Sequence, residues 1–201
     1  MSTEKIFLEK EIVKGKSTKA LAVFAKVIPD FRVLADLEPS EYINRLWNKY
    51  QDEFHEDNSV NGKIFEYILI SLLINKNIMP HYIQAKVAFV PNVDFDLLVY
   101  SKEKMIALSV KTSLRERYKQ ADLEAIALKY VHRKAENYLI TLNTKEAISV
   151  NSKIENGDVI GIDKVIDASS DSMNDFIYML ANVECIKAGK IDIINAMSIV
   201  D

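Results

Sequence analysis

Short apolar runs separated by polar turns occupy the middle and later parts of the chain. Runs of four to eight apolar residues bounded by turn residues are typical of strands buried in a sheet. The polar turn 101–104 joins two such runs and indicates a hairpin. The strands predicted in this way cover residues 82–90, 95–100, 105–111, 138–142 and 159–166.

Apolar positions repeat at helical spacing before and between these strands, which predicts amphipathic or buried helices. Residues 58–62 (Asn-Ser-Val-Asn-Gly) predict a loop instead. The resulting order of elements predicts a mixed α/β sheet with helices on both faces. The predicted helices cover residues 4–28 (interrupted near Gly15 and ended by Pro29), a segment that begins at 38–41, and residues 63–74, 114–134 and 172–188.

The composition is that of a globular protein, with 201 residues, 49% hydrophobic and 27% charged. We expect a single domain, residues 1–201, with a helical N-terminal part (1–60) and the chemically informative motifs in residues 62–142. The lone cysteine, Cys185, excludes a disulfide framework and a cysteine-based zinc site, and it favours a reducing, cytoplasmic setting. The apolar runs are too short to cross a bilayer, so we expect no membrane partner.

The net charge of −3 does not indicate a nucleic-acid-binding protein, but its distribution is uneven. Residues 111–134 hold seven Lys or Arg and three acidic residues, a local excess of positive charge in a chain that is negative overall. Such a face can bind phosphates whatever the total charge. The alternative is a helix face that is only solvated.

The predicted hairpin gathers polar side chains on one face near one end of the sheet. If Tyr100 pairs with Met105, then Asp96 lies opposite Ser109 and Asp94 opposite Lys111. Residues two apart on a strand share a face, and a polar cluster there is costly unless it is solvated or bound to something. An acid beside a lysine suits phosphodiester cleavage with Mg²⁺, in which the lysine contacts phosphate and the attacking water.

One carboxylate is a weak site for a dication, so we expect further acids from neighbouring helices. Glu124 and Glu66 are available, and Glu66 stands in an otherwise apolar segment where an acid needs a partner or a metal. The sequence leaves two alternatives open: Glu66 as an exposed member of a polar stripe with Lys63, and Glu124 as a solvated helix acid.

The triplet Arg115-Glu116-Arg117 follows Lys111 and opens the next predicted helix. Arginine donates two hydrogen bonds to guanine O6 and N7, and glutamate accepts one from cytosine N4. A helix N-terminus that enters the major groove would allow the triplet to read two adjacent G·C pairs. A salt-bridged helix start is the structural alternative.

The pattern Asp96-x12-Ser109-x-Lys111, with Arg115-Glu116-Arg117 and then Glu124, resembles the PD-(D/E)xK nuclease superfamily. It is most similar to a subset of type II restriction endonucleases that have S-x-K in place of the usual acid-x-Lys. The resemblance covers about residues 62–142. It implies a restriction-endonuclease-like sheet, a displaced metal-binding glutamate at Glu124, a further glutamate at Glu66, and an Arg-Glu-Arg element that reads a CC/GG core.

We therefore expect a Mg²⁺-dependent type II restriction endonuclease that cleaves double-stranded DNA at a short palindromic site and leaves 5′-phosphate ends. A palindromic site implies a two-fold symmetric homodimer. In this hypothesis Asp96 and Glu124 hold the metal, Lys111 orients phosphate and water, and Ser109 lies beside the site. The alternatives are a nuclease of the same superfamily without strict sequence specificity, and a binding module that has lost catalysis.

Overall fold

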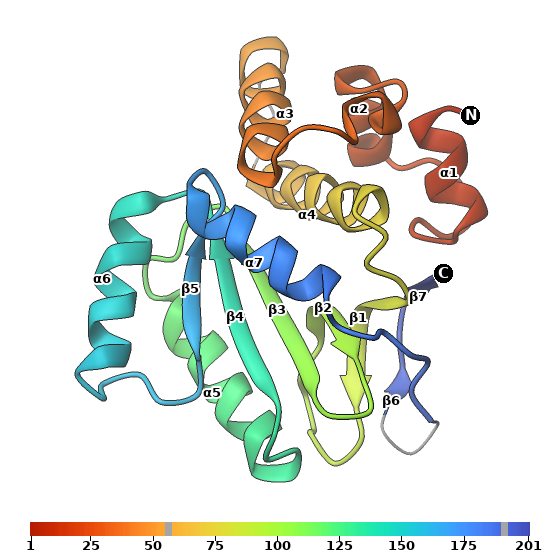
Figure 1. The fold of residues 1–201 in the computed structure, drawn as a ribbon. Helices are drawn as coiled ribbons and strands as arrows, with labels where there is room; N and C mark the ends of the chain where they lie inside the picture. Colours follow the sequence, from red (N-terminus) through yellow and green to blue (C-terminus); the bar gives the residue numbers. More distant parts are fainter. Residues whose placement is uncertain (55–57, 190–192) are drawn as a thin grey trace.

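A mixed β-sheet forms the centre of the fold (Figure 1). The computed structural model describes residues 1–54, 58–189 and 193–201. Strand β2 pairs antiparallel with both β1 and β3, whereas β3, β4 and β5 run parallel to one another. The order across the sheet is β5-β4-β3-β2-β1, and β6 and β7 both pair with the outer edge of β1. The strands are β1 (His81–Val87), β2 (Phe95–Tyr100), β3 (Met105–Lys111), β4 (Glu136–Thr141), β5 (Lys164–Asp167), β6 (Ile193–Asn195) and β7 (Ser198–Val200).

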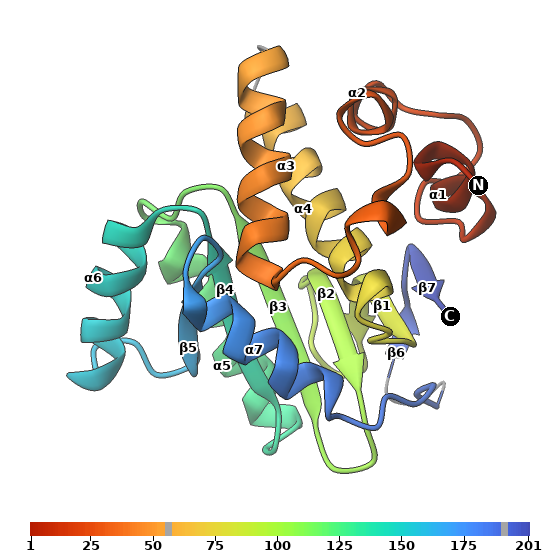
Figure 2. The same ribbon diagram turned by 45° about the horizontal axis from the view of Figure 1, so that its top comes forward.

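Helices cover both faces of this sheet (Figures 1 and 2). In β4, Ile140 packs in one buried cluster with Phe176 of the last helix, and the adjacent Leu139 packs in another with Ala125 and Val150. This two-residue alternation is what a strand buried on both faces requires. The predicted α/β fold is thereby confirmed. The helices are α1 (Thr3–Glu9), α2 (Lys19–Val27), a 3₁₀ turn (Phe31–Leu34), α3 (Pro39–Glu53), α4 (Asn58–Asn75), α5 (Arg117–Val131), α6 (Thr144–Glu155) and α7 (Asp171–Ala181).

The N-terminal helices follow the sequence prediction closely. The first helical region is interrupted around Gly15, where φ is +76°, and α2 ends shortly before Pro29. Pro39 stands in the first turn of α3, where its missing N–H costs nothing. Aromatic rings join these helices to α4: the Phe7 ring lies 5.2 Å from that of Tyr67. One buried cluster therefore continues from the N-terminal helices to the sheet.

The loop predicted at residues 58–62 is wrong, because these residues form the first turns of α4. Gly62 disfavours a helix by about 1 kcal/mol. Val60 is buried, however, and the Asn61 carboxamide accepts a 2.5 Å hydrogen bond from the Tyr50 hydroxyl. These tertiary contacts with α3 outweigh the local preference.

Helix α6 was not expected from the sequence, although Ala147, Val150 and Ile154 recur at helical spacing and pack in one cluster. Ala147 and Val150 are buried, whereas Ile148 is 66% exposed. The strand predicted at 159–166 begins only at Lys164, since Asp122 of α5 binds the main-chain N–H groups of residues 160–162. The helix predicted at 172–188 ends at Ala181.

The first predicted strand, 82–90, was also too long at its C-terminal end, because a turn follows Val87. The short strands β6 and β7 had no clear pattern of their own. They form because β1 offers an unpaired edge, on which Ile83 pairs with Ser198 and Lys86 with Asn195. Edge pairing of this kind depends on the completed sheet rather than on local sequence.

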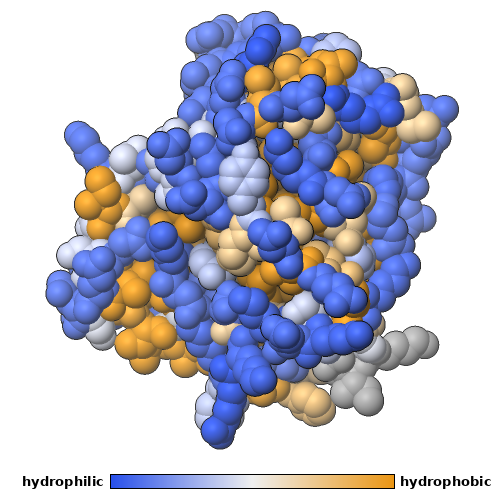
Figure 3. All heavy atoms as spheres, viewed as in Figure 1, coloured by the Kyte–Doolittle hydropathy of each residue, from blue (hydrophilic) through white to orange (hydrophobic). Residues whose placement is uncertain are grey.

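On the face seen in Figure 3, apolar side chains gather at the left, over α6 and its connection to β5. Two of the large exposed apolar residues, Ile148 and Ile160, belong to these segments. Within the described ranges, no helix is both long enough and apolar enough to cross a membrane.

Candidate active site

The β2–β3 hairpin brings Asp96 and Lys111 together at its open end. The pairing of Tyr100 with Met105, and of Leu97 with Leu108, is the register that the sequence predicted. The Lys111 ammonium donates to Asp96 Oδ2 at 2.6 Å, and the Val110 main-chain N–H donates to the same oxygen at 2.8 Å. Gln84 of β1 donates to the other oxygen at 3.3 Å. The Asp96 side chain is only 13% exposed, so the hairpin holds a largely buried ion pair.

Glu66 enters the same site from α4. Its side chain is 14% exposed and accepts a 2.6 Å hydrogen bond from Lys63, one turn earlier. Burial raises the pKa of Glu66 above its ordinary value, Lys63 opposes this change, and the charge of Asp96 adds to it. An acid that is buried, repelled by a second acid and close to Lys111 is typical of a functional site.

Asp94 and Asp96, which the predicted hairpin placed on one face, have different surroundings in the structure. Asp94 precedes β2, is half exposed, and forms a 3.7 Å ion pair with Lys86. Asp96 lies within β2 and faces Lys111. The geometry therefore favours Asp96 as the acid of the site.

A cavity of about 630 Å³ opens beside this group. It is bordered by the start of α4, the end of β3 and the connection from β3 to α5, which runs beside the start of α6 (Figure 2). Acidic, basic and small polar side chains share its wall. Its lining residues include Gly62, Glu66, Lys111, Ser113, Arg115 and Arg117.

The Arg-Glu-Arg triplet lies at the rim of this cavity, but it does not open the helix as predicted. Helix α5 begins at Arg117, with Glu116 as its N-cap, and Arg115 belongs to the preceding loop with φ of +44°. All three side chains are exposed. Glu116 forms an ion pair with Lys119, and the Arg117 guanidinium donates to the Ser113 carbonyl. Such exposed contacts are weak and exchange readily for other partners.

Ser109 and Glu124 lie together in a different place. They line a very small cavity, about 10 Å³, between β3 and α5, with Asn137 nearby. The Glu124 carboxylate accepts a 2.7 Å hydrogen bond from Gln120. The structure thus brings together Asp96, Lys111 and Glu66, and it places Glu124 beside Ser109 rather than in the larger cavity.

Among the described residues, no group of three or more His, Cys, Asp or Glu side chains could hold a metal ion. Two carboxylates, Asp96 and Glu66, interact electrostatically, and the charge of Asp96 contributes to the raised pKa of Glu66. Hard oxygen donors of this kind suit Mg²⁺, which retains several waters and needs only one or two carboxylates. Asp96 and Glu66, each paired with a lysine at 2.6 Å, are the residues of this site that could supply oxygen ligands to a Mg²⁺ ion. The expected ligand pair Asp96 and Glu124 remains a prediction.

Sequence reasoning missed Glu146, which holds the loop that bears the triplet. One of its carboxylate oxygens accepts from the Leu114 N–H at 2.6 Å, and the other accepts from the Arg115 N–H at 3.2 Å. The pattern Asn143-x-x-Glu146 is that of a capping box, so the sequence alone predicts a local role for this glutamate. The sequence offered no pattern for its long-range contact.

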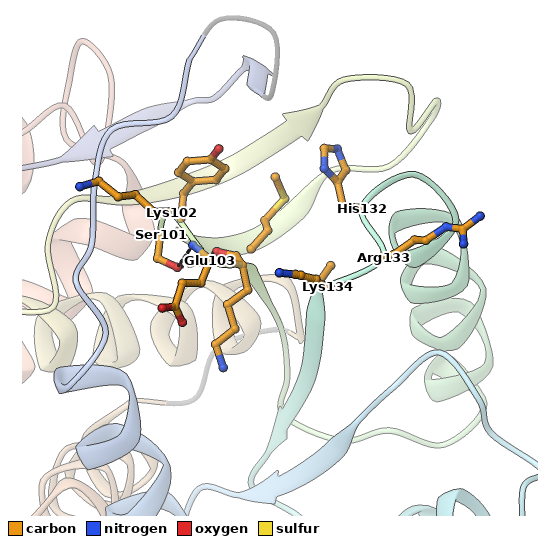
Figure 4. Close-up of a pocket in the computed structure, with 10 residues that line it drawn as sticks. Ser101, Lys102, Glu103, His132, Arg133 and Lys134 are labelled. Carbon is orange, nitrogen blue, oxygen red and sulfur yellow. Dashed lines mark hydrogen bonds between the residues drawn. The ribbon is translucent and has the colours of Figure 1, made fainter.

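A second cavity, of about 220 Å³, lies at the closed end of the same hairpin (Figure 4). The hairpin turn and the connection from α5 to β4 border it, and several basic residues contribute. Figure 4 shows that Lys102 and Arg133 point in different directions. Lys104, which also lines it, is paired with Glu136 at 2.6 Å. These basic groups do not converge on a common point.

Comparisons with models of protein families, with curated proteins and with solved structures found no match for this chain. Any statement about function therefore rests on the residues of the site and on the resemblance of their pattern.

Proposed function

We propose that this protein is a Mg²⁺-dependent endonuclease that cleaves double-stranded DNA at a short sequence containing G·C pairs. One observation is the main support: a single cavity is bordered both by Lys111 with Glu66 and by Arg115 with Arg117. Groups suited to phosphodiester chemistry thus stand next to groups suited to reading bases. A CC/GG-containing site is what the resemblance to S-x-K restriction endonucleases implies.

In this proposal Asp96 and Glu66 hold the metal, and Lys111 contacts the scissile phosphate. A bound Mg²⁺ would make water a better nucleophile and neutralise charge that develops on the phosphate. Lys111 is paired with Asp96 at 2.6 Å, so its ammonium is already directed into the site. Neighbouring fixed donors of this kind stabilise developing negative charge without having to reorganise.

The second part of the proposal concerns the bases. Arg115 and Arg117 would donate to guanine edges, and Glu116 would accept from cytosine. The three side chains are exposed beside the cavity, so a duplex seated there can meet them. A palindromic site would need two copies of the chain related by a two-fold axis, and we propose a homodimer for this reason.

Digestion of a plasmid of known sequence, with Mg²⁺, tests the proposal. We compare the wild-type protein with Lys111→Ala, and with Lys102→Ala as a matched lysine at the other end of the hairpin. Discrete fragments that map to one short site, lost only in Lys111→Ala, are the expected result. A smear or structure-dependent nicking would contradict sequence-specific cleavage and support a less specific nuclease. DNA binding without any cleavage would contradict catalysis and support a binding module in which Ser109 marks a lost acid.

A further inference from the structure

We propose that Glu146 is a positioning residue that fixes Arg115 for base reading, an inference that rests on the proposed function. Arg115 is separated from Glu146 by 31 positions in the chain, and the two residues belong to different segments of the fold. The contact links the loop before α5 to the first turn of α6.

The loop requires an external restraint because of its backbone. Arg115 has a φ of +44°, a left-handed conformation that is uncommon for a residue with a long side chain. Such conformations persist only where the surroundings impose them. The two oxygens of Glu146 bind the successive N–H groups of Leu114 and Arg115 and so define the orientation of both peptide planes.

The glutamate is itself held in place. The Asn143 carboxamide caps α6 by accepting from the Glu146 main-chain N–H at 3.1 Å. In a capping box, the glutamate side chain would return to the N–H of the cap residue. Here the Asn143 N–H bonds instead to the Thr141 hydroxyl, and the Glu146 carboxylate remains available to the loop.

A buried anchor lies next to this polar contact. Leu114 is fully buried in a cluster with Ala147 and Val150 of α6. The Leu114 side chain packs the loop against α6, and the Glu146 carboxylate fixes the direction in which the Leu114 and Arg115 N–H groups point. Arg115, the next residue, is left exposed at the rim of the cavity. Since base reading tolerates little positional error, we expect specificity to depend on this clamp.

The test has a DNA-independent arm and a DNA-dependent arm. In the first arm, hydrogen exchange at the Leu114 and Arg115 amides is measured in wild type, Glu146→Gln and Glu146→Ala. Glu155→Gln, an exposed glutamate at the end of α6, is the matched control. We expect exchange at these two amides to accelerate about tenfold or more in both Glu146 variants, because charged acceptors make strong hydrogen bonds. Unchanged exchange in folded Glu146→Gln would overturn the inference.

In the second arm, the cleavage rates of the cognate site and of sites with one altered base pair are compared. We expect Glu146→Gln to reduce discrimination about tenfold at the pair read by Arg115 and to leave other positions unchanged. In an Arg115→Ala background, Glu146→Gln should then have no further effect on discrimination. A purely structural role would instead lower cleavage at all sites alike, and that result would overturn the inference while leaving the proposed function intact. If the wild-type protein cuts no specific site, the proposed function fails, and the exchange arm still decides whether Glu146 holds the loop.

Discussion

Lys111 Nζ lies 2.6 Å from Asp96 Oδ2, across the open end of the β2–β3 hairpin. Both side chains are mostly buried, and the Val110 N–H completes the environment of the same oxygen. A buried ion pair is weak evidence for a role in stability, because desolvation offsets much of the attraction. The pair lies beside a large cavity and a second buried acid, Glu66, and this setting supports the proposed role in phosphodiester cleavage.

Removal of the Asp96 charge should greatly slow DNA cleavage without disturbing the fold. We expect Asp96→Asn to lower the rate of DNA cleavage at least about a hundredfold, because both the metal ligand and the partner of Lys111 are altered. Asp94→Asn is the control, since Asp94 is exposed and paired with Lys86. Equal losses in both variants would argue against a special role for Asp96.

Mg²⁺ should stabilise the protein through Asp96 and Glu66. A ligand that binds only the folded state raises the melting temperature. We expect millimolar Mg²⁺ to raise the Tm of the wild type and of Glu124→Gln, but not that of Glu66→Gln. If only Glu124→Gln lost the Tm shift, the metal ligands would instead be Asp96 and Glu124, the pair predicted from the sequence.

Arg115 should affect the choice of base rather than overall affinity. We expect Arg115→Ala to relax discrimination at one G·C pair by about 1–3 kcal/mol, as for the loss of a bidentate guanine contact. Lys119→Ala, on the exposed first turn of α5, should weaken binding equally on all sequences. The measurement is binding to a panel of duplexes that differ at single positions. A uniform loss in Arg115→Ala would mean that Arg115 contacts only phosphate.

His81 should make stability depend on pH below neutrality. It is fully buried in β1, and burial lowers its pKa to about 4, although its hydrogen bond with the Ile78 carbonyl opposes the change. Between pH 6.5 and 4 the unfolded chain binds a proton that the folded chain does not. The free energy of unfolding should therefore fall by about 2 kcal/mol from pH 8 to pH 5. Urea unfolding of wild type and His81→Gln tests this, and equal pH dependence in the two would contradict it.

Asp122 should be a major determinant of stability on the α5 face of the sheet. Its Oδ1 accepts from the N–H groups of residues 160–162 at 3.1, 2.6 and 3.2 Å. We expect Asp122→Ala to lower the free energy of unfolding by about 1–3 kcal/mol, because the N–H groups of the buried residues Gly161 and Ile162 lose their acceptor. Asp158→Ala, exposed in the same connection, is the control for denaturant unfolding. Similar values for both would contradict the prediction.

A side chain at position 161 should destabilise the protein, because the main chain of α5 lies against Gly161. A Cβ at this position would lie 2.4 Å from the Asp122 carbonyl and 2.7 Å from the Ile126 nitrogen, both main-chain atoms of α5. We therefore expect Gly161→Ala to lower the midpoint of denaturant unfolding. Gly62→Ala, where a Cβ would meet no atom within 4 Å, should leave it unchanged or raise it.

The sequence by itself determined the elements whose pattern is strong and local. The hairpin register follows from two apolar strands and a four-residue turn, and the pairs Tyr100–Met105 and Leu97–Leu108 confirm it. The predicted gathering of Asp96 and Ser109 on one face is not found, because Ser109 lines the small cavity with Glu124. Glu66 stood out because a charged residue in an apolar helix needs an explanation. The mixed sheet with helices on both faces followed from the order of the elements.

Tertiary structure decided what depends on contacts between distant segments. Helix α4 includes residues 58–62 because Asn61 bonds with Tyr50 of α3. Strand β5 begins later than predicted because Asp122 binds the main chain that precedes it. Strands β6 and β7 form because the outer edge of β1 is available for pairing. Tertiary structure also determines that Glu66 interacts with Asp96, that Glu124 lines a cavity with Ser109, and that Glu146 accepts a hydrogen bond from the Arg115 N–H. Local periodicity reports which face of an element is buried, whereas these contacts depend on which elements meet.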